Sequence, residues 1–185
     1  NRNTPKLIQW LPKDTNDSFD MTVYVDHYIR AAFSDPSKEK IGWLLESPQM
    51  NEEIINFILQ NLDKIRSEFK YIFTCMDSLL SLGHPFTYTI SNAVPWIWEK
   101  NRGLHKKDKL VSMIASNKGW LRGHKKRLEW VEKLKDKVDI YGTGRPLQLN
   151  EKEDGLKDYM FSVSIENDTS DAYFTEKLTD NFVLG

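Results

Sequence analysis

The chain has 185 residues, of which 39% are hydrophobic and 29% are charged, and its formal net charge is -1 at pH 7. These values are typical of a globular protein, and no apolar run approaches the roughly 18 residues that span a bilayer. The single cysteine, Cys75, excludes an internal disulfide and a cysteine-rich zinc site, and the four histidines show no ligand-like spacing, so we expect no metal.

Short runs rich in β-branched and aromatic residues predict strands in the first hundred residues. They cover residues 6–10, 21–25, 41–45, 71–73 and 86–90. Over residues 51–69 the apolar positions instead repeat every three or four residues and follow an acidic first turn, which predicts one amphipathic helix. Strands that alternate with helices favour parallel α/β sheets over a sandwich or a bundle.

Glu46 follows the apolar run 41–45 and precedes Ser47 and Pro48. A carboxylate at the C-terminal end of a buried parallel strand lies where α/β proteins bind ligands, and partial burial would raise its pKa to a value useful for a base. Two simpler interpretations stay open. In the first, Glu46 is a solvated residue that starts a loop. In the second, it is a negative charge near the N-terminus of the helix that begins near Asn51.

A polar, charged stretch over residues 98–109 contains Gly103 and predicts a domain boundary. We therefore expect an N-terminal α/β domain over residues 1–100 and a second domain over residues 101–185. Strands are predicted in the second domain at 110–115, 138–141 and 161–165, with a helix at 124–137.

Trp96 and Trp98 precede the boundary and fall on one face of an extended segment. They suit a platform on which a carbohydrate could stack, although core packing between the domains is favoured. Residues 100–137 are rich in Lys and Arg, but without a dense basic stripe or an aromatic RNA-binding motif. We expect a solvated face with one phosphate site and no nucleic acid.

The C-terminal stretch combines several polar groups. An alternating apolar run stops at Glu166 and Asn167, and a short polar segment then leads into a helix with Glu176 and Lys177 in its first turn. Backbone N–H groups at the start of a helix favour anions, so the stretch suits a phosphate-bearing ligand. The alternative is that these residues are ordinary first-turn and turn residues.

This stretch closely resembles the donor-binding motif of the α-1,3-fucosyltransferases, an inverting glycosyltransferase family that uses GDP-fucose. The family pattern is Tyr-Lys-Phe, three variable residues and Phe-Glu-Asn, followed after a gap by Tyr-x-Thr-Glu-Lys and a hydrophobic residue. Residues 159–167 and 173–178 match it, with mild departures at Met160 and Ile165. Upstream, residues 110–117 resemble the family's strand that ends in Ser-Asn, and the three residues from Glu46 to Pro48 resemble its Glu-Ser-Pro segment.

The resemblance implies a GT-B arrangement of two Rossmann-type domains, in which the N-terminal domain binds the acceptor and the C-terminal domain binds the nucleotide sugar. Since family members continue past this point with a further strand and helices, we expect a fragment with an incomplete second domain. The expected reaction is transfer of L-fucose from GDP-fucose, with inversion, to a hydroxyl of an oligosaccharide or lipid-linked glycan. No cofactor is expected, and the location is expected to be cytoplasmic or peripheral to a membrane.

The resemblance also implies roles for individual residues. Glu46 matches the family's base, and Arg127 and Lys177 match the cations at the diphosphate, although Lys125 and Lys126 are neighbours that compete with Arg127 for this assignment. Three further residues match positions near the donor. They are Asn167 and Tyr173, near the nucleotide or the sugar, and Glu176, at the sugar hydroxyls. Two alternatives remain, namely a related transferase with another nucleotide sugar and an inactive nucleotide-sugar-binding fragment.

Overall fold

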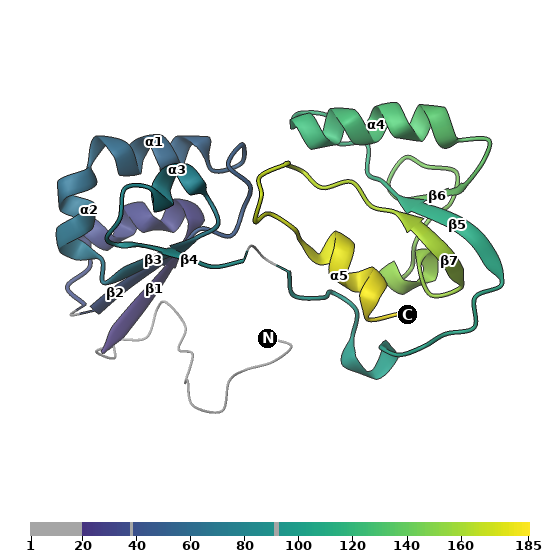
Figure 1. Cartoon of the computed structure of the whole chain (residues 1–185), viewed down its shortest axis with the longest axis horizontal. Helices are drawn as coiled ribbons and strands as arrows, with labels where there is room; N and C mark the ends of the chain where they lie inside the picture. The colour runs from purple at the N-terminus through teal and green to yellow at the C-terminus, as the bar shows by residue number, and fades with distance from the viewer. Residues whose placement is uncertain (1–19, 38, 91–92) are drawn as a thin grey trace.

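The computed structural model describes residues 20–37, 39–90 and 93–185, and it contains two parallel β-sheets. Figure 1 shows the sheets side by side in separate halves of the molecule. In the first half the order is β1-β2-β3-β4, and in the second it is β6-β5-β7. The strands are β1 (Met21–Val25), β2 (Glu39–Trp43), β3 (Tyr71–Thr74), β4 (Phe86–Tyr88), β5 (Lys109–Ile114), β6 (Asp139–Tyr141) and β7 (Tyr159–Val163). The predicted parallel α/β class is therefore confirmed.

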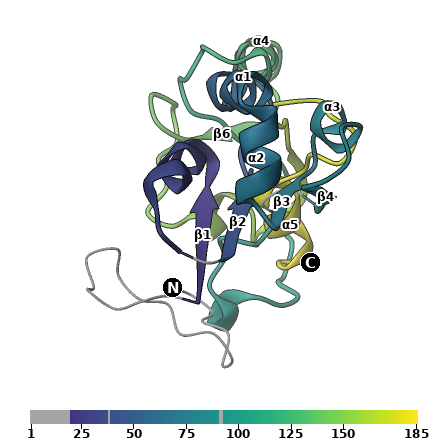
Figure 2. The same ribbon diagram turned by 90° about the vertical axis from the view of Figure 1, so that its left-hand side faces the viewer.

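Helical segments connect the strands of the first sheet and pack on it (Figure 2). They are the 3-10 helix η1 (Asp26–Ser34) and the α-helices α1 (Glu52–Gln60), α2 (Leu62–Glu68) and α3 (Asp77–Leu80). Each contributes at least one fully buried side chain to a shared core with Ile72 of β3, namely Ile29, Ile58, Ile65 and Leu79. Burial of this apolar surface is the main stabilising contribution to the half that carries Glu46.

The single helix predicted over residues 51–69 is wrong, because the chain forms two helices that meet at Asn61. The Asn61 side-chain amide donates to the carbonyl of Phe57 over 2.8 Å. An Asn side chain that bonds to the backbone competes with the helical hydrogen-bond ladder, so it favours a break at this position. The two apolar stripes still face the same core.

Several predicted strand limits also differ from those observed. β2 starts and ends two residues before the predicted 41–45, because its pairing with β1 begins at Glu39. β7 likewise precedes the predicted 161–165 by two residues, since its register with β5 begins at Tyr159. The predicted strand at 6–10 lies outside the described residues. The segments η1 and α3 were not predicted.

The second sheet has β5 at its centre. Helix α4 (Arg122–Leu134) connects β5 to β6 on one side, and the chain then returns to the other side of β5 as β7. The change of direction creates a topological switch point at the carboxyl ends of β5 and β7, where open α/β sheets bind ligands. The 3-10 helices η2 (Glu99–Asn101) and η3 (Lys152–Gly155) and helix α5 (Glu176–Phe182) complete this half.

The segment before η2 packs on the second half through Ile97. This side chain is fully buried in a cluster with Leu156 and Leu184. Trp96 and Trp98 instead keep 54% and 45% of their surface exposed, so the favoured interpretation of both as core residues is wrong. Alternation along the extended segment explains the result, because burying Ile97 turns its two neighbours toward the surface. No helix among the described residues combines the length and apolar character that crossing a membrane requires.

Candidate functional site

A cavity of about 560 Å³ opens at the switch point of the second sheet and reaches the end of β2 in the first half. Its volume falls in the range of small-molecule sites. The structure brings all six residues predicted from the sequence to its walls: Glu46, Arg127, Asn167, Tyr173, Glu176 and Lys177. Residues as far apart along the chain as Glu46 and Lys177 therefore line one cavity. Their chemical roles stay predictions.

Arg127 is the residue of its basic triplet that faces the cavity. It is only 6% exposed, whereas Lys125 and Lys126 are exposed. Its guanidinium donates from Nε and Nη2 to the carbonyl of Ile165, over 3.2 and 2.5 Å, and from Nη2 to the side-chain oxygen of Asn167 over 3.0 Å. Burial lowers the pKa of Arg127, but a guanidinium stays protonated at any physiological pH. The bonds thus fix a permanent cation at the end of β7.

Gly123 allows helix α4 to approach the loop after β7. A Cβ atom added there would lie 2.1 Å from the carbonyl oxygen of Glu166 and 2.6 Å from backbone atoms of Asn167. The Gly123 N–H also donates to the Asn167 carbonyl over 3.3 Å. Since backbone atoms cannot give way as a flexible side chain can, only glycine fits this contact. No local pattern in the sequence indicates it.

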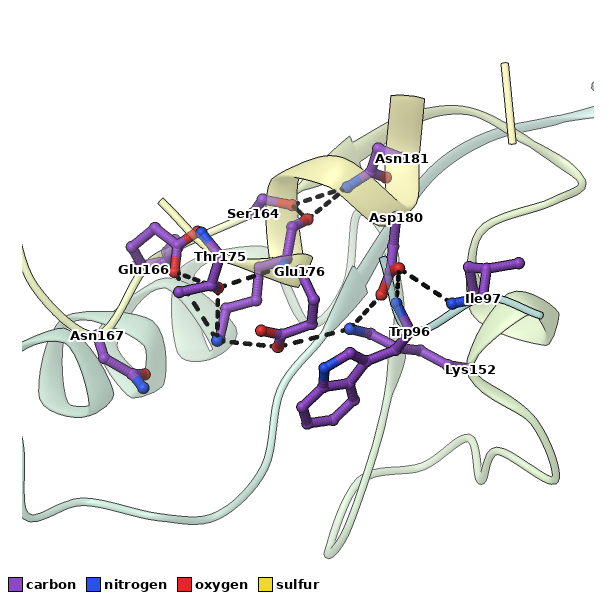
Figure 3. A network of polar contacts seen from close by, with 12 residues as sticks. Trp96, Ile97, Lys152, Ser164, Glu166, Asn167, Thr175, Glu176, Asp180 and Asn181 are labelled. Atoms are coloured by element: carbon purple, nitrogen blue, oxygen red, sulfur yellow. Dashed lines mark hydrogen bonds and ion pairs between the residues drawn. The ribbon is translucent and has the colours of Figure 1, made fainter. Parts of the chain in front are cut away.

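The Glu166 carboxylate fixes the start of α5. It accepts the backbone N–H of Thr175 at Oε1 and the Thr175 hydroxyl at Oε2, both over 2.8 Å (Figure 3). The Thr175 hydroxyl oxygen also accepts the backbone N–H of Lys177 over 3.3 Å, as an N-cap. These bonds join the end of the loop after β7 to the start of α5, so Glu166 and Thr175 position this wall of the cavity.

Lys177 and Glu176 form an ion pair at this wall. The Lys177 ammonium lies 3.1 Å from Oε1 of Glu176 and 3.8 Å from Oε2 of Glu166. Lys152 approaches Glu176 from the other side, at 3.6 Å (Figure 3). Burial by itself would raise the pKa of Glu176, but Lys177 and Lys152 outweigh it and the pKa is lowered. Glu176 is therefore an ionised hydrogen-bond acceptor at neutral pH.

Asp180 extends the network to the segment between the halves. Its carboxylate is fully buried, and Oδ1 accepts the backbone N–H groups of Trp96 and Ile97 over 2.6 and 3.2 Å (Figure 3). Oδ2 lies 2.5 Å from the Lys152 ammonium, which in turn lies 4.8 Å from the centre of the Trp96 ring. Neither Asp180 nor Lys152 could be predicted from the sequence, because their partners are distant along the chain.

Tyr173 and Glu46 face each other across the two halves. Burial raises the pKa of Tyr173, and Glu46 is the next largest cause, ahead of Glu166 and Glu176. Glu46 is exposed to the cavity. Burial against the cavity wall raises the pKa of Glu46, followed by the repulsion of Asp26, whereas Lys177 lowers it. Glu46 is thus exposed and lines the cavity, which suits both a solvated residue and a base, and its role as the base stays a prediction.

His124 is a further cavity residue that the scattered histidines of the sequence did not reveal. It is 5% exposed on α4, and its ring lies edge-on to Trp120 with 5.1 Å between the centres. Burial lowers the pKa of His124, and the charges of Arg127, Lys118 and Lys177 lower it further. The ring is thus neutral at neutral pH, among three cations that surround one part of the cavity.

The cavity lining therefore mixes cations with carboxylates. Lys118, Arg127, Lys152 and Lys177 face Glu46, Glu151 and Glu176. Such a set can hold a polyanion with hydroxyl groups, because cations bind phosphate and carboxylates accept hydroxyl protons. Within residues 20–37, 39–90 and 93–185, no group of three or more His, Cys, Asp or Glu side chains is placed to hold a metal ion.

Part of the chain matches a known protein family. Residues 104–184 match the model described as glycosyltransferase family 10 (fucosyltransferase) C-term. No curated protein and no solved structure matches the chain. The matched range contains α4, β7 and α5, and with them five of the six predicted site residues, so it coincides with the half that forms most of the cavity. Over residues 104–184 the chain is therefore similar to the C-terminal domain of the glycosyltransferases of family 10, the fucosyltransferases.

Proposed function

We propose that the cavity binds GDP-fucose and that the protein transfers L-fucose to a hydroxyl of an acceptor glycan with inversion at the anomeric carbon. One observation carries the proposal. Glu46 from the first half lines the same cavity as Arg127 and Lys177 from the second. A base on one side and a diphosphate site on the other are what inverting transfer requires, and the two parallel sheets that flank the cavity suit a GT-B arrangement.

Arg127 and Lys177 would hold the diphosphate. GDP leaves with two phosphate groups, so its departure depends on cations that compensate the developing charge. Arg127 is fixed by its bonds to Ile165 and Asn167, and it offers a preorganised guanidinium. Lys177, on a flexible stem beside Glu176, would exchange part of that ion pair for a phosphate oxygen when the donor binds.

Glu176 would bind the hydroxyl groups of the fucosyl ring. Its pKa is lowered by Lys177 and Lys152 although burial opposes this, so its oxygens are acceptors for hydroxyl donors. Tyr173 is 6% exposed between Glu46 and Glu176 and supplies an aromatic wall for the sugar. Asn167, bonded to Arg127, would contact the nucleotide portion.

Glu46 would act as the base. The acceptor oxygen attacks the anomeric carbon from the face opposite the diphosphate, while the Glu46 carboxylate takes the hydroxyl proton. The bond from that carbon to the β-phosphate oxygen breaks, and its electron pair leaves with GDP. The raised pKa of Glu46 suits this step, because a stronger base removes the proton more readily.

The test is transfer of labelled fucose from GDP-fucose to a panel of glycans, with wild type and Glu46→Gln compared. Glu46→Gln should lower turnover at least about 100-fold, the usual contribution of a general base, and leave affinity for GDP nearly unchanged. Proton NMR of the product should show the inverted anomeric configuration. Near-normal turnover by Glu46→Gln would rule out Glu46 as the base, and a retained configuration would rule out direct displacement.

A further inference from the structure

Asp26 lies at the C-terminal end of β1, next to the end of β2 that carries Glu46. Among the described residues, it is the non-glycine residue with a positive φ, at 48°. Such left-handed backbone is uncommon outside glycine, although Asp and Asn adopt it more readily than other residues. When it persists, surrounding contacts hold it, and it occurs often at functional sites.

The contacts that hold Asp26 all converge on one oxygen. Oδ1 accepts the backbone N–H of Leu45 over 2.8 Å, the backbone N–H of Glu46 over 3.2 Å and the side-chain amide of Asn51 over 2.8 Å. The Asn51 amide also donates to the carbonyl of Glu46 over 3.3 Å. Asn51 is only 4% exposed, so the cluster is screened from water at its centre.

These bonds replace a sheet ladder that ends just before the cavity. Leu44 still donates to the carbonyl of Phe73 in β3 over 2.9 Å, as a strand residue does. The next two N–H groups belong to Leu45 and Glu46, and both donate to Asp26 instead. The Asp26 carboxylate thus sets where the backbone of Glu46 leaves the sheet and enters the cavity wall.

We propose that Asp26 is a positioning residue for Glu46: its carboxylate fixes the backbone of Glu46 by hydrogen bonds and places a negative charge next to it. The proposal rests on the proposed function of Glu46. It also assigns a role to the left-handed backbone at Asp26, which directs the side chain toward the neighbouring strand. Glycine would adopt that backbone without strain, but it would lack the carboxylate.

Other charges also face Glu46. After burial, Asp26 makes the largest contribution to the raised pKa of Glu46, and Glu176 from α5 adds to it. Lys177 from α5 and Lys118 from the loop after β5 lower the pKa of Glu46. Tyr173 approaches from the loop before α5, and its own pKa is raised because of burial and the Glu46 charge. Of the charged residues named here that shift the pKa of Glu46, Asp26 lies in the same half of the molecule as Glu46.

Asp26→Asn separates charge from geometry. The Asn side chain keeps an oxygen that can accept the same three bonds, and it tolerates left-handed backbone, but it carries no charge. The carboxyl resonance of Glu46 is titrated by carbon-13 NMR in wild type and in Asp26→Asn, with Glu46→Gln used to assign the signal. Asp63→Asn, an exposed substitution on α2, is the matched control.

The pKa of Glu46 should be lower in Asp26→Asn than in wild type and unchanged in Asp63→Asn. The acidic limb of the kcat/KM profile should move to lower pH with it, because the base ionises earlier. Asp26→Ala, which also loses the hydrogen bonds, should lower kcat about 100-fold, the order of effect of a small displacement of a catalytic group. Its affinity for GDP should be unchanged.

An unchanged Glu46 pKa in Asp26→Asn would overturn the role of the Asp26 charge, and wild-type kcat in Asp26→Ala would overturn its role in positioning. The NMR titration does not depend on turnover. If wild type transfers no fucose while the Glu46 pKa still falls in Asp26→Asn, the proposed reaction fails but the coupling between the two carboxylates stands.

Discussion

The guanidinium of Arg127 donates to the side-chain oxygen of Asn167 over 3.0 Å and thereby joins helix α4 to the loop after β7. The two residues are 40 positions apart in the chain. Their contact brings a fixed cation to the switch point of the second sheet, where the cavity opens. Arg127 therefore serves the fold and the proposed donor site at once.

Arg127→Lys should weaken GDP binding although it keeps the positive charge. A lysine cannot reproduce the planar fork that bonds to Ile165 and Asn167, so the cation loses its fixed position. Loss of hydrogen bonds to a charged group predicts an affinity lower by about 10- to 100-fold in calorimetric titration. Lys126→Ala removes an exposed charge from the same helix and should leave the affinity near wild type.

Gly123→Ala should destabilise the protein and disturb the donor site. The added Cβ would meet the Glu166 carbonyl oxygen at 2.1 Å, so α4 and the loop have to move apart. Overpacking of this kind costs about 1–3 kcal/mol of unfolding free energy, measurable by urea denaturation. Gly119→Ala is the control, because its Cβ would meet only a Leu128 side-chain atom at 3.5 Å, an ordinary contact. Equal stability of the two variants would contradict the close approach of Gly123 to the Glu166 carbonyl oxygen.

Glu46→Gln should stabilise the fold at neutral pH. The pKa of Glu46 is raised in the folded protein, so ionisation disfavours the folded state. Below the unfolded pKa the residue is protonated in both states and contributes nothing. As the pH rises through the folded pKa, wild type loses stability that the glutamine variant keeps. Thermal denaturation across this range should show a higher melting temperature for Glu46→Gln than for wild type at neutral pH, and no difference at acidic pH. A variant less stable than wild type at neutral pH would contradict the raised pKa of Glu46.

Asp180→Asn should destabilise the second half and loosen the segment that precedes η2. The substitution leaves the Lys152 ammonium beside a neutral group in a buried position. Breaking such a pair costs about 2–4 kcal/mol once the partial exposure of Lys152 is allowed for. Asp171→Asn, at an exposed turn position, should change the free energy of unfolding by no more than about 0.5 kcal/mol. A double-mutant cycle with Lys152→Met would isolate the coupling between Lys152 and Asp180.

Local patterns predicted the parallel α/β class, and the resemblance to the fucosyltransferase motif pointed to six residues that line the cavity. The register of β7 escaped prediction, since the alternating run continues to Ile165. Pairing with β5 nevertheless ends at Val163, and the Ile165 carbonyl accepts hydrogen bonds from Arg127 instead. The helix break at Asn61 likewise depends on one side-chain bond that periodicity does not reveal.

The supporting residues of the site could not be predicted because each acts through a distant partner. Asp26, at the end of β1, accepts hydrogen bonds from Leu45 and Glu46, which follow the neighbouring strand β2. Asp180 accepts a hydrogen bond from the backbone of Trp96, 84 residues earlier in the chain. Gly123 matters only for the backbone that packs on it. Such contacts depend on the assembled sheet order, which short-range periodicity does not contain.

Calorimetric titration with GDP-fucose, GDP-mannose and UDP-galactose is the decisive test of whether this cavity is a GDP-fucose site. We expect saturable binding of GDP-fucose, weaker binding of GDP-mannose and the weakest binding of UDP-galactose, with the preference for GDP-fucose lost together with affinity in Arg127→Lys. Tighter binding of UDP-galactose than of GDP-fucose, or binding that Arg127→Lys leaves unchanged, would show that the cavity is not the proposed donor site.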